Sequence, residues 1–452
     1  MNASVYSPET DEFSAYLSYA LNRLEKGSVV LKDEQRSCIK ELYQGHDVFL
    51  WPPTGFGKSL CYQVIPLLFD WKSASSWERE NGQIPSVSSI LVIQPLLSLM
   101  IDQVGQLRKC GISASILSYG ESVPKTFQAT QQGVSQCTYL FSSPEALLAS
   151  NWREVITDAA VSRRVVAVVV DEAHCASKWS RDFRRTYGRL HEIRALVPPR
   201  TPFLACTATA TVSVRKEVVR SLEMSPCVVI SRSPDRPNIF YEARDRTTIE
   251  LDFQDLLFNL RSKRAAAPRA IVYCQSLNMC ADIYAHFHYE LGDDSYYSRT
   301  AGKKSSNRLF AMFHAGTADS IKKNVLESLN QPDGVVRVVI ATIALGMGVD
   351  LKDTNLVIHY GAPRSIEDYF QESGRGGRRG TFAKSIVYWK PRDCPLHKIE
   401  ESIRHREMAT VRRYLENTLK CRREQLLTYF NWDSSSQVLS PQNCCDVCLR
   451  KA

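Results

Sequence analysis

The sequence contains no long apolar run and no secretion signal. No stretch of its 452 residues approaches the roughly 18 consecutive apolar residues of a membrane-spanning helix. The first residues have neither the basic start nor the apolar centre of a signal peptide. A repeat with the period of a solenoid is also lacking. We therefore expect a chain that neither crosses a membrane nor enters an oxidising compartment, so that its 14 cysteines stay reduced.

Positive charge is only mildly in excess over negative charge. The chain has 57 basic and 48 acidic residues, which gives a net charge of +9. This balance favours a polyanionic partner, although charge alone is also compatible with a basic protein that has no such partner. Apolar residues make up 44% of the chain, as in ordinary globular proteins, and the length suits two or three domains rather than one core.

Short apolar runs alternate with longer helical patterns in two successive sets. The first set lies at residues 48–51, 90–94, 139–142, 165–170 and 203–207, and the second at 270–274, 336–342, 356–360 and 385–389. Continuous apolar strands separated by helices predict parallel sheets covered on both faces. A proline-rich polar stretch at 231–237 suits a linker, and the polar residues 291–307 predict a surface insertion. A helical segment at about 394–430 leads to the last cysteines.

The first apolar run leads into the sequence PPTGFGKS, residues 52–59. Strand, glycine turn and helix start follow in the order of a phosphate-binding loop, in the shorter Pro-Thr-Gly-x-Gly-Lys-Ser form. In such a loop the lysine reaches the β- and γ-phosphates, the serine hydroxyl holds Mg²⁺, and glycines let N–H groups surround the anion. A plain glycine-rich turn is the alternative. The residues expected to contact the nucleotide are Thr54, Gly55, Gly57, Lys58 and Ser59.

The longest apolar run of the first set ends in Asp171-Glu172-Ala173-His174. A strand that delivers two carboxylates at its end is the expected partner of a phosphate-binding loop. We expect Asp171 to hold Mg²⁺ together with Ser59, and Glu172 to orient and deprotonate the attacking water. A solvated acidic turn is the alternative. His174 can relay the state of the phosphate, although a lone histidine is more often a hydrogen-bonded core residue.

The second half of the chain contains a glycine-rich segment at residues 371–380 with arginines three positions apart. Arg375 and Arg378 would share one face of a helical turn. Because a guanidinium is planar, permanently charged and able to bind phosphate through two hydrogen bonds, such residues serve as arginine fingers that complete ATP sites. A basic loop that binds nucleic acid is the alternative. Just upstream, the glycines of residues 341–350 let the backbone approach a nucleotide or a nucleic acid.

The last cysteines have the spacing of metal ligands. Cys421 is followed at a distance by Cys444, Cys445 and Cys448, of which the last two form a Cys-x-x-Cys pair. Four thiolates in a reducing compartment predict a structural zinc ion with Zn–S distances of about 2.3 Å. A spare cysteine beside such a pair can also be a buried thiol. The remaining cysteines are scattered over predicted strands and helices and suit small buried side chains.

In this order the motifs resemble those of superfamily 2 helicases and, more narrowly, of the RecQ family of DNA helicases. The resemblance runs from about residue 31 to the C-terminus and includes residues 94–103 and Gln35, whose amide can pair with adenine N6 and N7. With the family's fold in mind, we also expect Gln371 and Asp350 at the nucleotide site. What the resemblance implies is an α/β fold of two RecA-like parallel-sheet domains in tandem, with the ATP site between them.

The most specific part of the resemblance is residues 175–187, directly after the acidic sequence. It resembles the aromatic-rich loop of RecQ proteins, which couples single-stranded DNA binding to ATP hydrolysis. Trp179 and Phe183 offer ring faces to bases at about 1–3 kcal/mol each, and Arg184 adds charge and stacking. Burial of both rings in a core is the alternative, but the charged residues around them make burial costly.

The cysteine segment resembles the small helical zinc-binding subdomain of RecQ proteins. Its usual spacing would place a cysteine at Gln442, so either Cys444 takes that role or the site has three thiolates. Only four residues follow Cys448, and we expect the winged-helix and helical DNA-binding modules of larger relatives to be absent. The implied domains are a RecA-like ATP-binding domain at 1–232, a second RecA-like domain at 233–392 and the zinc-binding subdomain at 393–452.

The resemblance implies a DNA helicase that uses ATP, Mg²⁺ and Zn²⁺ to translocate 3′→5′ and unwind duplexes during DNA repair and recombination. Its partners would be single-stranded and tailed duplex DNA, with no membrane, and the chain would act as a monomer. It would be nuclear in a eukaryote, or lie in the cytoplasm or nucleoid of a bacterium. An RNA helicase of the same superfamily and a DNA-binding relic without unwinding activity are the alternatives.

Overall fold

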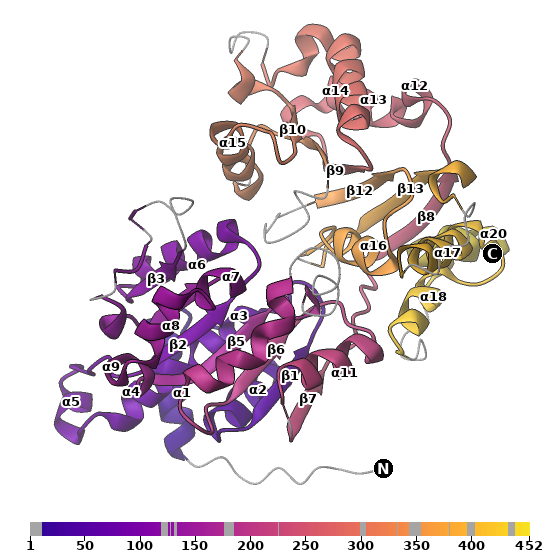
Figure 1. The fold of residues 1–452 in the computed structure, drawn as a ribbon. Helices are drawn as coiled ribbons and strands as arrows, with labels where there is room; N and C mark the ends of the chain where they lie inside the picture. Colours follow the sequence, from indigo (N-terminus) through magenta and orange to yellow (C-terminus); the bar gives the residue numbers. More distant parts are fainter. Residues whose placement is uncertain are drawn as a thin grey trace. The chain divides into compact units, whose positions relative to one another are not determined.

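The structure is a computed structural model that describes residues 11–118, 125–126, 128–130, 133–175, 185–224, 226–298, 304–331, 333–342, 354–378, 380–395, 403–432 and 439–452. The chain divides into two compact units, Met1–Ser233 and Pro234–Ala452 (Figure 1). In the ranges described, no helix has both the length and the apolar character needed to cross a bilayer.

The first unit is built on a seven-stranded sheet in which every neighbouring pair of strands is parallel. Its order is β3-β4-β2-β5-β6-β1-β7. Because parallel strands end at the same edge, residues that follow β1 and β5 lie at one edge of this sheet. The strands are β1 (Asp47–Trp51), β2 (Ser89–Ile93), β3 (Ala114–Leu117), β4 (Tyr139–Ser142), β5 (Val165–Asp171), β6 (Phe203–Cys206) and β7 (Cys227–Ser231).

Helices connect these strands and bury both faces of the sheet. Val48 and Leu50 of β1 belong to the core formed with α1, α2, α4 and α6, while Phe49 between them is fully buried on the opposite face. The helices are α1 (Asp11–Arg23), α2 (Asp33–Tyr43), α3 (Lys58–Gln63), α4 (Ile65–Ser73), α5 (Ser76–Glu80), α6 (Leu97–Lys109), α7 (Pro144–Leu147), α8 (Ser150–Thr157), α9 (Ala159–Ser162) and α11 (Val212–Ser221), with a 3₁₀ segment at Arg185–Leu196.

The second unit repeats the design with a six-stranded parallel sheet of order β10-β11-β9-β12-β13-β8. One face packs on α12, α13 and α14, and the other on α15 (Figure 1). The strands are β8 (Ile239–Asp245), β9 (Arg269–Cys274), β10 (Phe310–Phe313), β11 (Val338–Ala341), β12 (Thr354–Tyr360) and β13 (Ala383–Trp389). The helices are α12 (Ile249–Asp252), α13 (Gln254–Lys263), α14 (Leu277–Leu291), α15 (Asp319–Asn330) and α16 (Ile366–Ser373).

Three further helices pack beside β8, at the edge of the second sheet: α18 (Arg422–Tyr429), α19 (Pro441–Cys444) and α20 (Asp446–Lys451). The helix before them, α17 (Ile403–Glu416), packs on α16. Cys445 forms a backbone bridge with Tyr241 of β8. The Arg423 guanidinium donates to Asp235 Oδ1 at 2.5 Å and to the carbonyl of Arg236 at 2.8 Å. These helices are therefore attached to the strand that begins the second unit.

The expected fold class is confirmed: two parallel-sheet domains stand in tandem, with a helical cysteine-bearing segment at the end. All nine predicted strands exist. The sequence interpretation missed four more, β3, β7, β8 and β10, and each of them is an edge strand of its sheet. Of the predicted insertion at 291–307, the described residues form short 3₁₀ turns, Gly292–Ser295 and Ser305–Asn307, and an antiparallel bridge between Tyr296 and Arg308.

Candidate functional site

The predicted phosphate loop connects β1 to α3. Gly55 and Gly57 have φ angles of 79° and 92°, in the region that favours glycine. A Cβ on Gly57 would lie 2.8 Å from the amide nitrogen of Gln35, so a larger residue fits there neither in conformation nor in space. Thr54 and Ser59 are half-buried, and Gly55 is exposed. The loop therefore opens to solvent at the carboxyl end of β1, where an anion can enter.

Lys58 and Glu172 form the central ion pair of this edge. Lys58 Nζ lies 3.5 Å from Glu172 Oε1, and the two side chains are 15% and 16% exposed. Burial disfavours a charge on Lys58, yet the carboxylates of Glu172 and Asp171 raise the pKa of its ammonium group. Burial likewise opposes ionisation of Glu172, but Lys58 and His174 lower the pKa of its carboxyl to about 2. Both groups are thus charged at neutral pH.

Glu172 has two further unusual properties. Its φ angle is 49°, a left-handed conformation that is costly for a residue with a side chain. Its buried Oε2 atom has no hydrogen bond of good geometry within the described part of the chain, and its near partner there is His174 Nδ1, 3.3 Å away. Backbone strain and a poorly satisfied acceptor are found where function rather than packing decides the conformation. The Oε2 atom is available to accept a proton or to orient water.

Asp171, the last residue of β5, is held from both sides. Its Oδ2 atom accepts a hydrogen bond of 2.9 Å from Gln94 Nε2, and its Oδ1 atom accepts one of 2.9 Å from the backbone N–H of Glu172. The Cys206 thiol donates to Oδ1 at 3.2 Å. The carboxylate is only 8% exposed, so it is oriented before any ligand arrives. The role of Gln94 was missed, although it ends the second predicted strand as Asp171 ends the fourth.

His174 is buried between this pair and the next strand end. Its Nδ1 atom lies 2.8 Å from Thr207 Oγ1 and 3.3 Å from Glu172 Oε2. Burial opposes a charge on the imidazole, but the Cys175 sulfur and the Glu172 carboxylate raise its pKa to about 10. Thr207 Oγ1 also accepts from the N–H of Thr209 at 3.2 Å. The two threonines thus link the end of β6 to the Asp-Glu-Ala-His segment.

Gln35 is placed under the phosphate loop. Its Nε2 atom donates to the carbonyls of Phe56 and Gly57, both at 3.2 Å, and its Oε1 atom accepts from the N–H of Lys32 at 3.0 Å. Lys32 Nζ donates to the Phe56 carbonyl at 2.8 Å and lies 4.4 Å from the centre of the Phe56 ring. In this structure the Gln35 amide supports the loop backbone, and its contact with adenine stays a prediction.

In the second unit, the glycine-rich segment after α16 is bound through its backbone. Arg236 donates to the carbonyls of Gly374 at 3.1 Å and of Gly376 at 3.0 Å, and Asn238 Nδ2 donates to the carbonyl of Gly377 at 2.8 Å. Arg236 lies within the stretch that the sequence predicted to be a linker, and Asn238 directly follows it. Neither residue belongs to a motif, so the sequence contains no signal for these contacts.

The predicted fingers lie beside Tyr273, on β9. Burial raises the pKa of Tyr273, and the guanidinium groups of Arg375 and Arg378 oppose that rise. Arg375 is 3% exposed and Arg378 is half-buried. Gln371 is half-buried near the end of α16, and the next residue, Glu372, contacts His359 Nε2 at 2.8 Å in the core. The structure thus brings Gln371, Arg375 and Arg378 to one end of α16.

The four predicted zinc ligands lie together. The sulfur atoms of Cys421, Cys444, Cys445 and Cys448 are all within 4.8 Å of one another. Corners of a tetrahedron with Zn–S bonds of about 2.3 Å are about 3.8 Å apart, and the Cys421 sulfur lies 3.5 Å from that of Cys444 and 3.9 Å from that of Cys445. The N–H groups of Arg422 and Cys448 both point at Cys445 Sγ at 3.4 Å. This cluster fits a four-cysteine zinc site.

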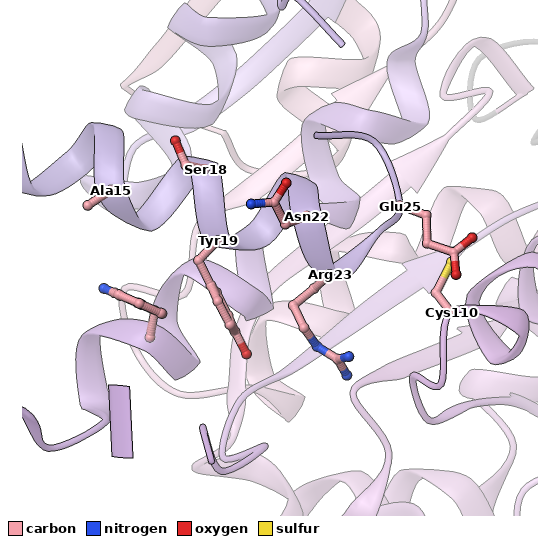
Figure 2. Close-up of a pocket in the computed structure, with 8 residues that line it drawn as sticks. Ala15, Ser18, Tyr19, Asn22, Arg23, Glu25 and Cys110 are labelled. Atoms are coloured by element: carbon pink, nitrogen blue, oxygen red, sulfur yellow. The ribbon is translucent and has the colours of Figure 1, made fainter. Parts of the chain in front are cut away.

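Other predicted site residues lie outside the described residues: Trp179, Phe183, Arg184 and Asp350. A cavity of about 640 Å³ lies in the first unit between α1, Trp71 of α4 and Cys110 after α6. Figure 2 shows side chains that line it. Its lining includes Tyr19, Arg23 and Glu25 but no residue of the phosphate loop or of the Asp-Glu-Ala-His segment. We therefore place the functional site at the open strand ends rather than in this cavity.

Sequence comparison finds three successive family matches along the chain. Residues 32–218 match the DEAD/DEAH box helicase family, residues 252–380 the helicase conserved C-terminal domain, and residues 392–449 the RecQ zinc-binding domain. The phosphate loop, the Asp-Glu-Ala-His segment, the arginine pair and the four cysteines lie within these matches, whereas Arg236 and Asn238 lie between the first two.

Two curated relatives match over most of this chain. The chain is 32% identical to ATP-dependent DNA helicase hus2/rqh1 of Schizosaccharomyces pombe, over 93% of this chain and 30% of that protein. It is 32% identical to ATP-dependent DNA helicase RecQ of Haemophilus influenzae, over 92% of this chain and 61% of that protein. The chain therefore spans between about a third and three fifths of the length of these relatives.

Solved structures share the fold at lower sequence identity. The helicase Lhr of Mycobacterium smegmatis, bound to single-stranded DNA and AMP-PNP, superposes with a TM-score of 0.63 at 18% identity, over 90% of this chain and 50% of that one. The DEAD-box helicase Mss116, bound to single-stranded RNA, gives 0.65 at 13% identity, over 97% and 85%. At these identities the likeness establishes the arrangement of each parallel sheet and its helices.

Proposed function

This chain belongs to the RecQ family of helicases, and on that premise we propose that it is an ATP-dependent DNA helicase motor. The observation that carries the proposal is the ion pair of Lys58 with Glu172, 3.5 Å apart at the carboxyl edge of the first sheet. A cation for phosphates and a carboxylate for water, held ionised side by side, are what phosphoryl transfer to water requires. An inert DNA-binding relic would have no use for this strained and buried arrangement.

At the phosphate loop, Lys58 binds the β- and γ-phosphates, and the loop N–H groups from Thr54 to Ser59 surround them. Ser59 and Asp171 would hold Mg²⁺, which neutralises phosphate charge when bound. The carboxylate of Asp171 is already oriented by Gln94, which supports this role. Glu172 orients the attacking water and takes its proton on the carboxylate, which Lys58 and His174 keep ionised.

Arg375 and Arg378 of the second unit serve as arginine fingers in ATP hydrolysis. Arg378 is the more accessible of the two and contacts the γ-phosphate, while Arg375, buried beside Tyr273, supports it. The backbone hydrogen bonds from Arg236 and Asn238 keep the segment rigid. Gln371, half-buried near the end of α16, and Asp350 contribute to nucleotide binding, as the family resemblance implies.

The DNA contacts reside in residues 175–187, where Trp179 and Phe183 stack on bases and Arg184 binds the backbone. Translocation runs 3′→5′ along single-stranded DNA, with tailed duplexes as substrates in repair and recombination. The cysteine cluster binds zinc and stabilises α18, α19 and α20 against β8, because these short helices bury little apolar area without it. An RNA helicase shares the fold, so nucleic-acid preference has to be measured.

The test combines ATP hydrolysis with strand displacement. We expect ATP hydrolysis to rise with single-stranded DNA more than with RNA of the same sequence, and 3′-tailed duplexes to be opened in preference to 5′-tailed ones. Trp179→Ala should lose the DNA-stimulated part of hydrolysis and keep the basal part. Greater stimulation by RNA would establish the rival function, and hydrolysis without any displacement would restrict the protein to translocation.

A further inference from the structure

The second unit contains a cavity that the proposed function does not use. Its volume is about 620 Å³, within the range of ligand sites. The cavity lies where β11, β9, β12 and β13 begin, lined by Arg337, Arg269, Leu356 and Lys384. These four strands are consecutive in the parallel sheet. The glycine-rich segment and its arginines follow α16, which starts beyond the carboxyl end of β12. The cavity therefore lies at the opposite edge of the sheet, where the strands begin.

Within the described ranges, neither Arg337 nor Lys384 of this cavity forms an ion pair, although the carboxylate of Asp255 is also part of the lining. Arg337 donates to the carbonyl of Gly334 at 2.7 Å, but its Nε is buried and has no hydrogen-bond partner within the described ranges. Burial lowers the pKa of Arg337, and no nearby acid counters this effect. Lys384 is exposed, with its Nζ atom 5.6 Å from the centre of the Phe240 ring. A ligand carboxylate would supply the missing counter-charge and the missing acceptor.

Apolar side chains make up much of the remaining lining, alongside the polar residues Asp255, Asn259 and Asn355. Leu256 and Ala267 are buried in the lining, and Phe382 is 44% exposed beside Lys384. Phe258 stands on α13 one turn after the lining residue Asp255 and is 68% exposed. Exposed aromatic rings around a concave site are typical of surfaces that bind other proteins.

We propose that this cavity binds a short extended peptide of a partner protein, in which Asp or Glu residues alternate with Phe, Leu or Trp. The carboxylates pair with Arg337 and Lys384, and the apolar side chains pack on Leu256 and Phe382. Four strands at a spacing of about 4.8 Å span about 14 Å, which an extended peptide covers with four or five residues.

A peptide fits better than a nucleic acid. A nucleic-acid strand places a phosphate at every nucleotide and needs cations along its whole path. Here the acidic side chain of Asp255 is part of the lining, and the cations are separated by apolar side chains. An alternating peptide tolerates this mixture because successive side chains of an extended chain point to opposite sides.

The test measures binding of two fluorescein-labelled pools of mixed hexapeptides to the full chain by fluorescence anisotropy. One pool alternates Asp or Glu with Phe, Leu or Trp, and the other has Lys or Arg at the acidic positions. We expect saturable binding of the acidic pool alone. Lys384→Glu and Phe382→Ala should each weaken it about tenfold or more.

Matched controls lie on the same unit. Lys323→Glu changes a side chain that is 76% exposed on α15, and Tyr289→Ala removes a ring that is 84% exposed on α14. Neither should change binding of the acidic pool. Because Lys384 is exposed and Phe382 half exposed, the thermal midpoint of every variant should stay close to that of the unchanged chain.

Several results would overturn the proposal. These are equal binding of both pools, equal weakening by Lys323→Glu and Lys384→Glu, and no saturable binding of the acidic pool up to about 1 mM. If Lys384→Glu weakened the binding of a single-stranded oligonucleotide and left peptide binding unchanged, the cavity would be assigned to nucleic acid instead. None of these measurements uses ATP, so they are independent of the proposed helicase activity.

Discussion

The phosphate loop of the first unit and the arginine segment of the second are stabilised in opposite ways. At the phosphate loop, contacts run between side chains of opposite charge, with Lys58 facing Glu172 and His174 behind it. In the arginine segment, neutral backbone carbonyls of the glycines are bound by Arg236 and Asn238. The first region thus depends on charges and the second on fixed hydrogen bonds.

This difference indicates how each region responds to a ligand. An ion pair such as that of Lys58 and Glu172 can exchange one partner for a phosphate or a water-bound cation, since both are charged groups. Backbone hydrogen bonds to the glycine carbonyls have no such alternative, and breaking them leaves buried acceptors unpaired. We therefore interpret the phosphate loop as an adaptable region and the arginine segment as a rigid one.

The largest expected effect comes from removing the central charge. Lys58→Ala should abolish ATP hydrolysis, with a loss beyond the ~10³–10⁵ range of an arginine finger, because both the phosphate contact and the partner of Glu172 disappear. Binding of single-stranded DNA should change little. Steady-state hydrolysis and DNA anisotropy measure the two, and Lys72→Ala on α4 is the control. Hydrolysis at the original rate would refute the assignment of this loop.

In the arginine segment, the sharpest test is a substitution of Arg378. Arg378→Ala should lower turnover by about 10³–10⁵ while nucleotide affinity falls much less, because a finger stabilises the transition state rather than the bound nucleotide. Single-turnover hydrolysis and binding of a fluorescent ATP analogue separate these quantities. If the variant instead loses DNA affinity and retains basal hydrolysis, the segment is a nucleic-acid loop.

The position of a strand within its sheet explains whether the sequence predicts it. Interior strands such as β5 are buried on both faces and therefore have continuous apolar sequences. The missed strands lie at the edges, where one side of the strand has no neighbour. Cys227–Ser231 and Phe310–Phe313 each contain partly exposed positions, and Ile239–Asp245 ends in charged residues. Such strands are stabilised by pairing with a neighbour, which a local pattern does not reveal.

The functional residues were also predictable only in part. Lys58, Asp171 and Glu172 are recognisable because their motifs place reactive groups directly after strands. Arg236 and Asn238 bind carbonyls about 140 residues away, and their side chains carry no motif of their own in a proline-rich stretch. Gln35 illustrates a third case: the residue was identified, but its observed contacts are with the loop backbone. Long-range hydrogen bonds of this kind require the folded chain.

A pair of glycine variants measures the rigidity of the arginine segment. Gly377 and Gly380 have φ angles of 58° and 79°, so alanine strains both, by about 1–2 kcal/mol. A Cβ on Gly380 meets nothing within 4 Å, whereas one on Gly377 lies 2.3 Å from Asn238 Nδ2. Gly377→Ala should therefore destabilise the protein by about 2–4 kcal/mol, because the Asn238 hydrogen bond is also lost. Equal denaturant midpoints for the two variants would contradict a rigid segment.

The smallest effect tests whether charge stabilises the phosphate-loop side. His174, with a pKa raised to about 10, contributes stability that is fully present below its ordinary pKa of 6.5 and is lost as pH rises through 10. Glu172, with a pKa lowered to about 2, contributes stability that is present above its ordinary pKa of 4.5 and is lost as pH falls towards 2. The joint contribution is therefore greatest between pH 4.5 and 6.5.

His174→Gln keeps a side chain of similar reach that can contact Thr207 but removes the titrating charge between Glu172, Cys175 and Lys58. The stability advantage of the unchanged chain over this variant should shrink by about 1 kcal/mol between pH 7 and pH 8, since a fully coupled group contributes at most about 1.4 kcal/mol per pH unit. Urea midpoints at both pH values measure it. A constant or growing advantage would mean that His174 is neutral in the folded protein. The phosphate-loop side would then depend on hydrogen bonds to Thr207, as the arginine segment depends on those from Arg236.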